Sequence, residues 1–475
     1  MDTIAITFPK VKVNAEIKDL TFDNLEDMIF EISQNIARKV FEKALTDIDS
    51  YLRNKRERGK LKNTGKRKKY FLTRFGDILY ARTRYKDRCG KSHYLLDEAL
   101  SIVKNQRLSL SRARIECFLS ALSSYREVVE GISLLIGGPR CHEAIRQSVI
   151  KEGKLIIENQ EKRLKQIENL DYPDKEAPDT AYIEADATYI TLQKKGKEKG
   201  GKLEVKLGVG YTGKEARYTS GKSKRLKEKF TLVGTGKDFM RNLSLLAEER
   251  LSLSQAKKVI FGGDGDSWIT SGIKDYFPLA TYILDLYHLY KKFKESLRRR
   301  KEEQKLINDL LLSNQIDQGL SVIDQMIRNP YDLKEKDNLV KLYTYISRNR
   351  QGISNQVKLK DQEIESAGAI ESNINKVIAS RFKKRGMSWS KPGALALLKI
   401  KETILNNEWD DWWRTERERN IKVGRYQPPL SASYFKKETE ASPVIEVTIP
   451  ALSGPDQGKP WVGVLRKLSR VGYFN

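Results

Sequence analysis

The chain has 475 residues and a formal net charge of +26; 39% of its residues are hydrophobic and 32% are charged. This length predicts more than one domain, and the hydrophobic content excludes a disordered chain. Because no run of about 18 apolar residues occurs, a bilayer-spanning helix is excluded. The excess of positive charge then predicts nucleic acid, and no membrane, as the partner.

The start of the chain and its cysteines indicate a compartment. Met1 to Lys10 contains no charged leader followed by an apolar block, so we expect no secretory signal. Cys89, Cys117 and Cys141 are too scattered for a disulfide framework, which fits a reducing compartment such as the cytoplasm.

Residues 1–175 form the predicted N-terminal DNA-binding region. Residues 1 to about 52 show helical apolar spacing, and a basic run at 53–69 follows. We interpret this run as a flexible arm that contacts DNA phosphates; a solvated linker is the alternative. The candidate phosphate contacts in the arm are Arg53, Lys55, Arg56, Lys66, Arg67, Lys68 and Lys69.

The remainder of this region combines a small β segment with helices. Residues 70–85 alternate like strands around a turn at Gly76-Asp77. Between residues 108 and 170 we expect helices at 109–122 and 125–135 and a longer one from near His142. Such helices are compatible with helix-turn-helix DNA binding, with Arg140 and Arg146 near the groove, or they are simply packed helices.

After a predicted domain boundary at 171–179 the periodicity changes to two. Strands are expected at Tyr182–Leu192, Leu203–Val209, Phe230–Val233, Val259–Phe261 and Thr281–Leu284, with helices at Lys237–Leu253 and Ser267–Tyr276. Three paired strands followed by alternating helices and strands predict an α/β fold with an RNase H-like core, whose first part is 178–289.

The segment 290–364 has no strand pattern and is predicted to be an all-helical insertion. Its start is crowded with candidate DNA-binding cations, including Lys291, Lys292, Arg298 and Arg299. We expect residues 365–408 to complete the core and residues 409–475 to form a small C-terminal appendage.

Acidic residues stand at the ends and faces of these elements. In the first core strand, Glu184 and Asp186 share one face because successive side chains alternate. Two acids on an apolar strand need cations, partners or solvent, so an edge strand with a wet face is the alternative. Asp264 follows the strand at 259–261, where α/β sheets place active sites, although Asp266 in the same loop competes with it.

Two further acids complete the pattern. Asp285 ends a strand, and a helix starting there would place His288 on the same face. Glu371 lies in the first turn of a helix predicted from Ala369 to Arg385, with Asn375 one turn later. Arg381 and Arg385 of this helix are further candidate DNA contacts. A dipole-favoured Glu and an N-capping Asp are the ordinary alternatives.

The combination predicts phosphodiester chemistry. Two-metal catalysis needs three or four carboxylates around a pair of cations, and Mg²⁺ (or Mn²⁺) prefers carboxylate oxygens and substrate phosphate. Asp186, Asp264 and Glu371 are the expected catalytic residues and ligands of two such ions. Asp285, His288, Glu184, Asp266 and Asn375 are expected beside them.

At these motifs the sequence resembles the ISLre-type insertion-sequence transposases of bacteria, a group related to Mutator-like transposases and formerly an uncharacterised protein family. The resembling segments are IEADATYITLQ (183–193), GGDGDSWI (262–269), LDLYH (284–288) and GAIESNINKVIASRFKKRGMSWS (368–390). FGDILYARTRYKDRCGKSHYLLDEAL near the N-terminus is also similar, so the resemblance covers most of the chain.

The resemblance implies a metal-dependent transposase with Asp186, Asp264 and Glu371 as its triad and with Asp285 and His288 as an Asp-x-x-His pair. It implies binding of double-stranded DNA, at element ends and target, by a homodimer or larger assembly in the cytoplasm at the nucleoid. This chain departs from the pattern at Ala187-Thr188 and at Asn375-Lys376. An inactive or domesticated DNA-binding protein and a structure-specific RNase H-like nuclease are the alternatives.

Overall fold

The structure is a computed structural model that describes residues 21–423 except 57–58, 139, 174, 195–199, 217–223, 362–367 and 384–385. The chain divides into two compact units, and the described residues all belong to the unit Ala15–Gly424. The expectations for residues 1–20, for Arg385 and for most of the appendage lie outside the described residues. No helix among the described residues is both long enough and apolar enough to cross a membrane.

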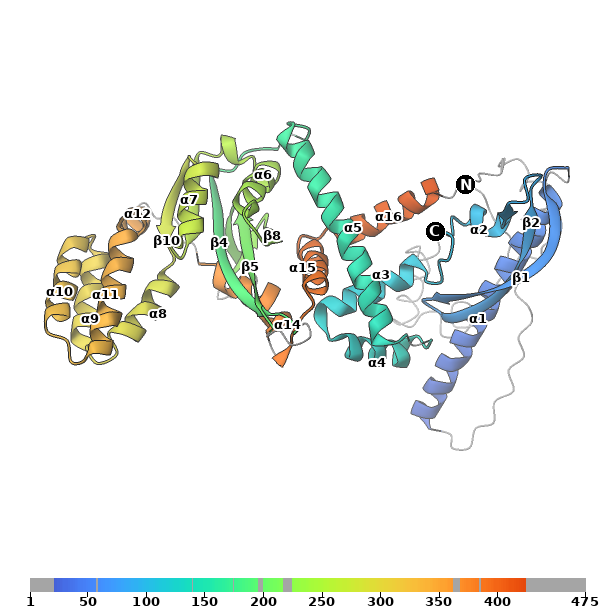
Figure 1. Ribbon diagram of the computed structural model, residues 1–475, viewed down its shortest axis with the longest axis horizontal. Helices are drawn as coiled ribbons and strands as arrows, with labels where there is room; N and C mark the ends of the chain where they lie inside the picture. Colours follow the sequence, from blue (N-terminus) through green and yellow to red (C-terminus); the bar gives the residue numbers. More distant parts are fainter. Residues whose placement is uncertain are drawn as a thin grey trace, which may run out of the picture. The chain divides into compact units, whose positions relative to one another are not determined.

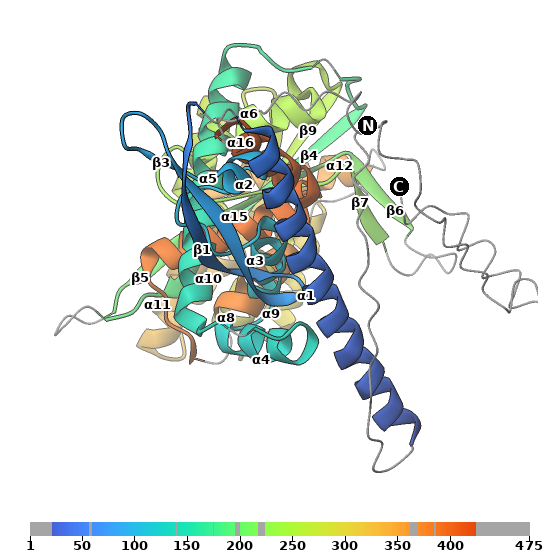
Figure 2. The same ribbon diagram turned by 90° about the vertical axis from the view of Figure 1, so that its right-hand side faces the viewer.

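A long helix and a β ribbon form the N-terminal part (Figure 1). The elements are α1 (Phe22–Lys55), β1 (Lys62–Thr73), β2 (Gly76–Lys86), β3 (Ser92–His93) and α2 (Leu95–Ala99). In Figure 2, α1 runs alongside the antiparallel β1–β2 ribbon. Asp49 of α1 accepts hydrogen bonds from the backbone N–H and the hydroxyl of Thr83 on β2, at 3.0 and 2.6 Å.

This arrangement corrects the prediction of a flexible basic arm at 53–69. Residues 62–69 belong to β1, because they pair with β2 from Lys62↔Lys86 to Lys69↔Tyr80. The hairpin closes at Thr73↔Gly76, so the turn lies two residues earlier than the predicted turn at Gly76-Asp77.

The three predicted helices are present as α3 (Leu110–Leu122), α4 (Tyr125–Leu135) and α5 (His142–Glu168). Helices α3 and α5 pack against α15 (Lys391–Leu405). The contact with α5 is so close that a Cβ added at Gly153 would lie 2.4 Å from the Cα of Ala396. The face of α5 that carries Gly153 is therefore covered by α15.

A mixed five-stranded sheet occupies the centre of the described unit. Its strands are β4 (Thr180–Thr191), β5 (Lys202–Tyr211), β8 (Phe230–Gly234), β9 (Lys258–Gly263) and β10 (Ala280–Leu284), in the order β10-β9-β4-β5-β8. β4, β5 and β8 are antiparallel neighbours, whereas β9 and β10 run parallel to β4. A separate small ribbon joins β6 (Gly213–Ala216) and β7 (Lys224–Lys227). The predicted mixed α/β class is confirmed, whereas the ribbon of β6 and β7 was not predicted.

Each face of the sheet has its own apolar core. Ile183, Ala185 and Phe261 pack with α6 (Phe239–Leu251), the short turn η1 (Leu253–Gln255) and α7 (Ser267–Tyr276). Tyr182 and Val209 face the opposite core with α15 and a helical run. That run consists of α13 (Ile370–Ile374), a π-helical turn η2 (Asn375–Ala379) and α14 (Ser380–Phe382). The alternation of β4 thus separates the two cores, as its sequence predicts.

The segment after β10 is helical throughout its described residues. It contains α8 (Leu286–Ser296), α9 (Lys301–Leu312), α10 (Ile316–Arg328), α11 (Leu333–Arg348) and α12 (Arg350–Asp361). These helices enclose a separate apolar core that includes Phe293, Ile307 and Ile323, and α12 contacts β10. The last described helix is α16 (Trp409–Val423).

Candidate active site

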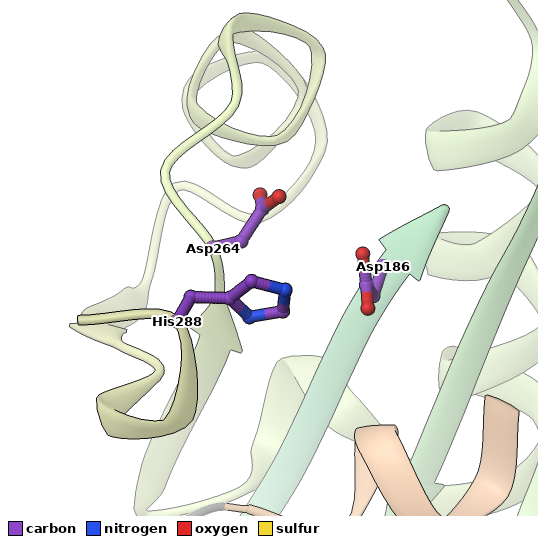
Figure 3. A group of neighbouring side chains, drawn as sticks. All are labelled: Asp186, Asp264 and His288. Atoms are coloured by element: carbon purple, nitrogen blue, oxygen red, sulfur yellow. The ribbon is translucent and has the colours of Figure 1, made fainter. Parts of the chain in front are cut away.

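Two of the predicted acids meet because their strands are parallel neighbours. The pairing of β4 with β9 ends at Ala185↔Gly263, so the next residues, Asp186 and Asp264, follow side by side. Asp186 is 6% exposed, and Asp264 is partly buried in the loop after β9. Figure 3 shows Asp264 above the His288 ring and Asp186 on the neighbouring strand to the right of both.

His288 is placed by the start of α8. Asp285 is the N-cap of this helix; its carboxylate accepts from the backbone N–H of Tyr287 at 3.0 Å and lies 3.1 Å from Nδ1 of His288. One ligand atom each of Asp186, Asp264 and His288 lie within 4.8 Å of one another. A histidine that binds a metal through one ring nitrogen usually donates the N–H of its other ring nitrogen to a carboxylate. The pair Asp285 and His288 has this arrangement.

Glu371 lines a cavity together with Asp186 and His288, but it lies outside the group of three, and Asp264 is not among the residues that line this cavity. The cavity has a volume of about 620 Å³. It is lined by Asp186, Ala187, Thr188, Tyr287, His288, Lys291, Gly368, Glu371, Ser372, Ile374, Asn375, Ala379 and Lys383. Asn375 therefore shares the cavity with Glu371, as the helical spacing predicts.

The loop after β9 distinguishes the two competing aspartates. Asp266 is exposed and precedes α7 at its N-cap, and its backbone N–H donates to the carboxylate of Asp264 at 3.0 Å. Asp264 faces Asp186 and His288. The geometry thus favours Asp264 as a ligand and places Asp266 at the start of α7.

Burial determines the electrostatics of the group. It raises the pKa of Asp186 to about 6, opposed by the charge of His288 and reinforced by Asp264 and Glu371. Burial also raises the pKa of Asp264. The hydrogen bond with Asp285 raises the pKa of His288. Carboxylates gathered in this way lose stability as anions, and a bound cation would offset that loss.

The residues present fit a divalent cation. Asp186 and Asp264 supply carboxylate oxygens and His288 an imidazole nitrogen, and Glu371 adds its carboxylate to the cavity that Asp186 and His288 line. Carboxylate oxygen suits Mg²⁺ and Mn²⁺, and Mn²⁺ also accepts imidazole.

Glu184 is the most buried of the predicted acids, at 1% exposure. Its carboxylate accepts hydrogen bonds from the Tyr211 hydroxyl and from backbone N–H groups at the start of α13. It therefore faces the helix that carries Glu371 and not solvent, which excludes the wet-edge alternative for this residue.

Two contacts made by the helical segment were not predicted from the sequence. The Tyr345 hydroxyl, on α11, donates to the backbone carbonyl of Asp264 at 2.8 Å. Asn349 packs on Gly265, where a Cβ would lie 2.2 Å from its side-chain oxygen and where φ is +85°. These residues lie about 80 positions from the loop they support, so no local pattern could indicate them.

The candidate DNA contacts fall into two groups. Lys69 is buried against Asp97 at 3.1 Å, and Arg140 pairs with Glu116. Arg381 is 4% exposed and donates to the backbone carbonyl of Ser120 at 3.0 Å. Each of these three cations already has a partner within the protein, which disfavours a phosphate contact, and DNA binding by them stays a prediction.

Most of the other candidates remain at the surface. The exposed ones are Arg53, Lys55, Lys66, Arg67, Lys68, Lys291, Arg298 and Arg299. Arg299 pairs with Asp332 at 2.9 Å. Others are partly engaged: Arg146 with Glu143, Arg56 over the Tyr85 ring and Lys292 over the Tyr345 ring. DNA binding by these residues stays a prediction.

The fold is an α/β fold built on a mixed sheet, and Asp186, Asp264 and His288 form a group beside its parallel strands β4 and β9. These features define an α/β protein with a candidate metal centre. The chain matches the uncharacterised protein family UPF0236 over residues 16–418 and belongs to it. The part of the resemblance that concerned an uncharacterised family is therefore confirmed.

Three relatives illustrate the family. A UPF0236 protein of Caldanaerobacter subterraneus subsp. tengcongensis, whose name joins eleven locus designations, is 24% identical over 405 residues, covering 84% of this chain and 81% of its own. Another from this bacterium, with four locus designations, is 24% identical over 421 residues, covering 86% and 83%. A Streptococcus gallolyticus protein, named for the vanSb 3′ region, is 22% identical over 396 residues, covering 82% and 85%.

Proposed function

We propose that the protein is a DNA transposase of the Asp–Asp–Glu type, which binds the terminal inverted repeats of its insertion sequence and catalyses metal-dependent cleavage and strand transfer. The observation that carries the proposal is the convergence of Asp186 and Asp264 from adjacent parallel strands, with Glu371 in the cavity that Asp186 and His288 also line. Carboxylates gathered around a pair of cations suit phosphodiester chemistry at two metals.

Three further observations support the proposal. The sheet order β10-β9-β4-β5-β8, with three antiparallel strands and then two parallel ones, suits an RNase H-like core. The net charge of +26 suits a polyanionic substrate. Two of the relatives have names that join several locus designations of one bacterium. A gene that is copied within its genome would occur at several loci in this way.

The residues of the cavity have distinct roles in this proposal. Asp186, Asp264 and Glu371 would hold two Mg²⁺ or Mn²⁺ ions, with His288 beside them. When bound, such ions activate the attacking water or 3′-hydroxyl and stabilise the leaving oxygen. Asp285 orients the His288 ring through Nδ1, which leaves Nε2 available to the group of acids.

Two lysines suit the phosphates of the substrate. Lys291 on α8 and Lys383 after α14 line the cavity that Asp186 and Glu371 also line. Lys383 also donates to the hydroxyl of Thr188, two residues beyond Asp186 on β4. A cation held in this way can bind a non-bridging phosphate oxygen without neutralising the carboxylates that bind metal.

The proposal places the protein in the bacterial cytoplasm at the nucleoid, bound to double-stranded DNA as a homodimer or larger assembly. Two element ends have to be paired before both can be joined to a target, so one chain alone offers too few active sites. The exposed cations of β1 and α8 are the proposed phosphate contacts.

The decisive experiment is a cleavage and strand-transfer assay with purified protein, Mg²⁺ or Mn²⁺, and DNA carrying the element's own ends. Asp264→Asn is compared with Asp266→Asn, a matched control two residues along the same loop. We expect cutting at the ends and joined products, lost in the first variant and kept in the second. Cutting without joining would indicate a structure-specific nuclease, and binding without cutting an inactive DNA-binding protein.

A further inference from the structure

Glu184 is a buried carboxylate that the proposed chemistry does not use. It lies on β4 two residues before Asp186, on the same face of the strand, and only 1% of its surface is exposed. A buried carboxylate is costly unless hydrogen bonds or a cation compensate its charge. Its partners therefore reveal what it does.

The partners of Glu184 lie at the start of the helical run that carries Glu371. Backbone N–H groups of Gly368, Ala369 and Ile370 donate to it at 3.0, 2.9 and 3.0 Å. The Tyr211 hydroxyl donates at 2.6 Å from β5. The first N–H groups of a helix have no partner within the helix, and the positive end of its dipole favours a carboxylate.

This cap comes from a distant part of the chain. A helix is usually capped by the residue just before it, but the N-cap residue Ala369 makes no side-chain cap hydrogen bond. Glu184 supplies those hydrogen bonds from 184 to 186 positions away. The strand that holds Asp186 thereby also holds the first turn of the helix that holds Glu371.

The same contacts argue against Glu184 as a further metal ligand. Its Oε1 accepts from the Tyr211 hydroxyl and the Ala369 N–H, while Oε2 accepts from all three backbone N–H groups. Both oxygens are thus surrounded by donors. Among the described residues, Glu184 is also not a member of the group formed by Asp186, Asp264 and His288.

We propose that Glu184 is a positioning residue: it anchors the start of the Glu371 helix to β4 and so sets the separation of Glu371 from Asp186. This inference rests on the proposed function, because the separation of Glu371 from Asp186 matters only if both bind metal. The contact of Glu184 with the helix can nevertheless be tested without DNA. Replacing a residue that hydrogen-bonds to metal ligands, without binding the metal itself, typically weakens metal binding by about 10- to 100-fold.

The test uses Glu184→Gln in the full-length protein, with Tyr211→Phe as a milder variant that leaves the carboxylate in place. Glutamine keeps one acceptor oxygen but turns an NH₂ group toward backbone donors, so part of the cap is lost. Hydrogen exchange of the segment 368–376 is measured by mass spectrometry, and Mn²⁺ binding by titration. The matched control is Glu204→Gln, because Glu204 accepts from the Tyr189 hydroxyl across the same two strands at the surface.

We expect Glu184→Gln to speed exchange in 368–376 alone and to weaken Mn²⁺ binding about tenfold, with a smaller change in Tyr211→Phe and none in Glu204→Gln. Unchanged exchange in Glu184→Gln would overturn the proposal. Faster exchange over the whole sheet would mean a general structural role, and complete loss of Mn²⁺ binding would make Glu184 a ligand; both also overturn it. If the wild-type protein cuts no DNA, the proposed function fails while the exchange measurement still decides the anchor.

Discussion

Replacing Asp186 by asparagine is expected to stabilise the metal-free protein while removing its response to metal. Asp186 is 6% exposed, and burial raises its pKa from 3.8 to about 6. The folded protein therefore binds this proton more tightly than the unfolded chain does. Stability is lost as the pH rises from 3.8 through about 6, and the loss at neutral pH amounts to about 3 kcal/mol.

Asparagine carries no charge, and its side-chain oxygen can still accept from the Ala187 N–H as Asp186 does. In EDTA at pH 7.5, Asp186→Asn should unfold several degrees higher than the wild type, and the difference should vanish near pH 4. Addition of Mn²⁺ should raise the Tm of the wild type and leave that of the variant unchanged. Thermal unfolding followed by fluorescence across this pH range measures both effects.

Asp275→Asn is the matched control, because Asp275 is an exposed aspartate on α7 and its replacement should leave the Tm and the Mn²⁺ response unaltered. An Asp186→Asn variant that is less stable than the wild type at every pH in EDTA would refute the electrostatic reasoning. A variant that Mn²⁺ still stabilises would refute the assignment of Asp186 as a ligand.

Three further outcomes are expected. Tyr345→Phe removes the hydrogen bond to the Asp264 carbonyl and should lower the cleavage rate about fivefold at unchanged DNA affinity, measured by single-turnover kinetics. Burial raises the pKa of Glu152 to about 7, so the free energy of unfolding falls as the pH rises from 4.5 through 7. In Glu152→Gln the free energy of unfolding should fall less between pH 5 and pH 8.5, as measured by urea titration. Gly153→Ala places a Cβ 2.4 Å from α15 and should lower the free energy of unfolding by about 2 kcal/mol or more. Gly131→Ala meets no atom within 4 Å and should raise it by about 0.5 kcal/mol; denaturant unfolding compares the two variants.

Local sequence patterns predicted the elements that position the acids. The period-two segments at 182–192 and 259–261 form β4 and β9, and their spacing predicts Asp264 just beyond the end of the second strand. The parallel pairing of β4 with β9, which brings Asp264 beside Asp186 in the middle of β4, comes from the structure. The all-helical character of the segment after β10 was equally visible, since its periodicity never changes to two.

Which cations are free could not be predicted in this way. Lys69, Arg140 and Arg381 occur in basic or helical stretches that look like DNA-binding surface, yet each meets a partner from another element. The basic run at 62–69 likewise became a strand, because pairing with β2 outweighs the tendency of a charged, glycine-interrupted segment to remain extended in solvent.

The strands and helices of the sheet region, and the positions of the acids along them, follow from local pattern, because alternation and helical periodicity act over a few neighbouring residues. What surrounds those acids depends on how distant elements pack. Glu184 reaches the helix of Glu371, and Tyr345 reaches the loop of Asp264, across separations of 184 and 81 residues. Such contacts arise when packed elements bring distant donors and acceptors within hydrogen-bonding distance, which no local spacing encodes.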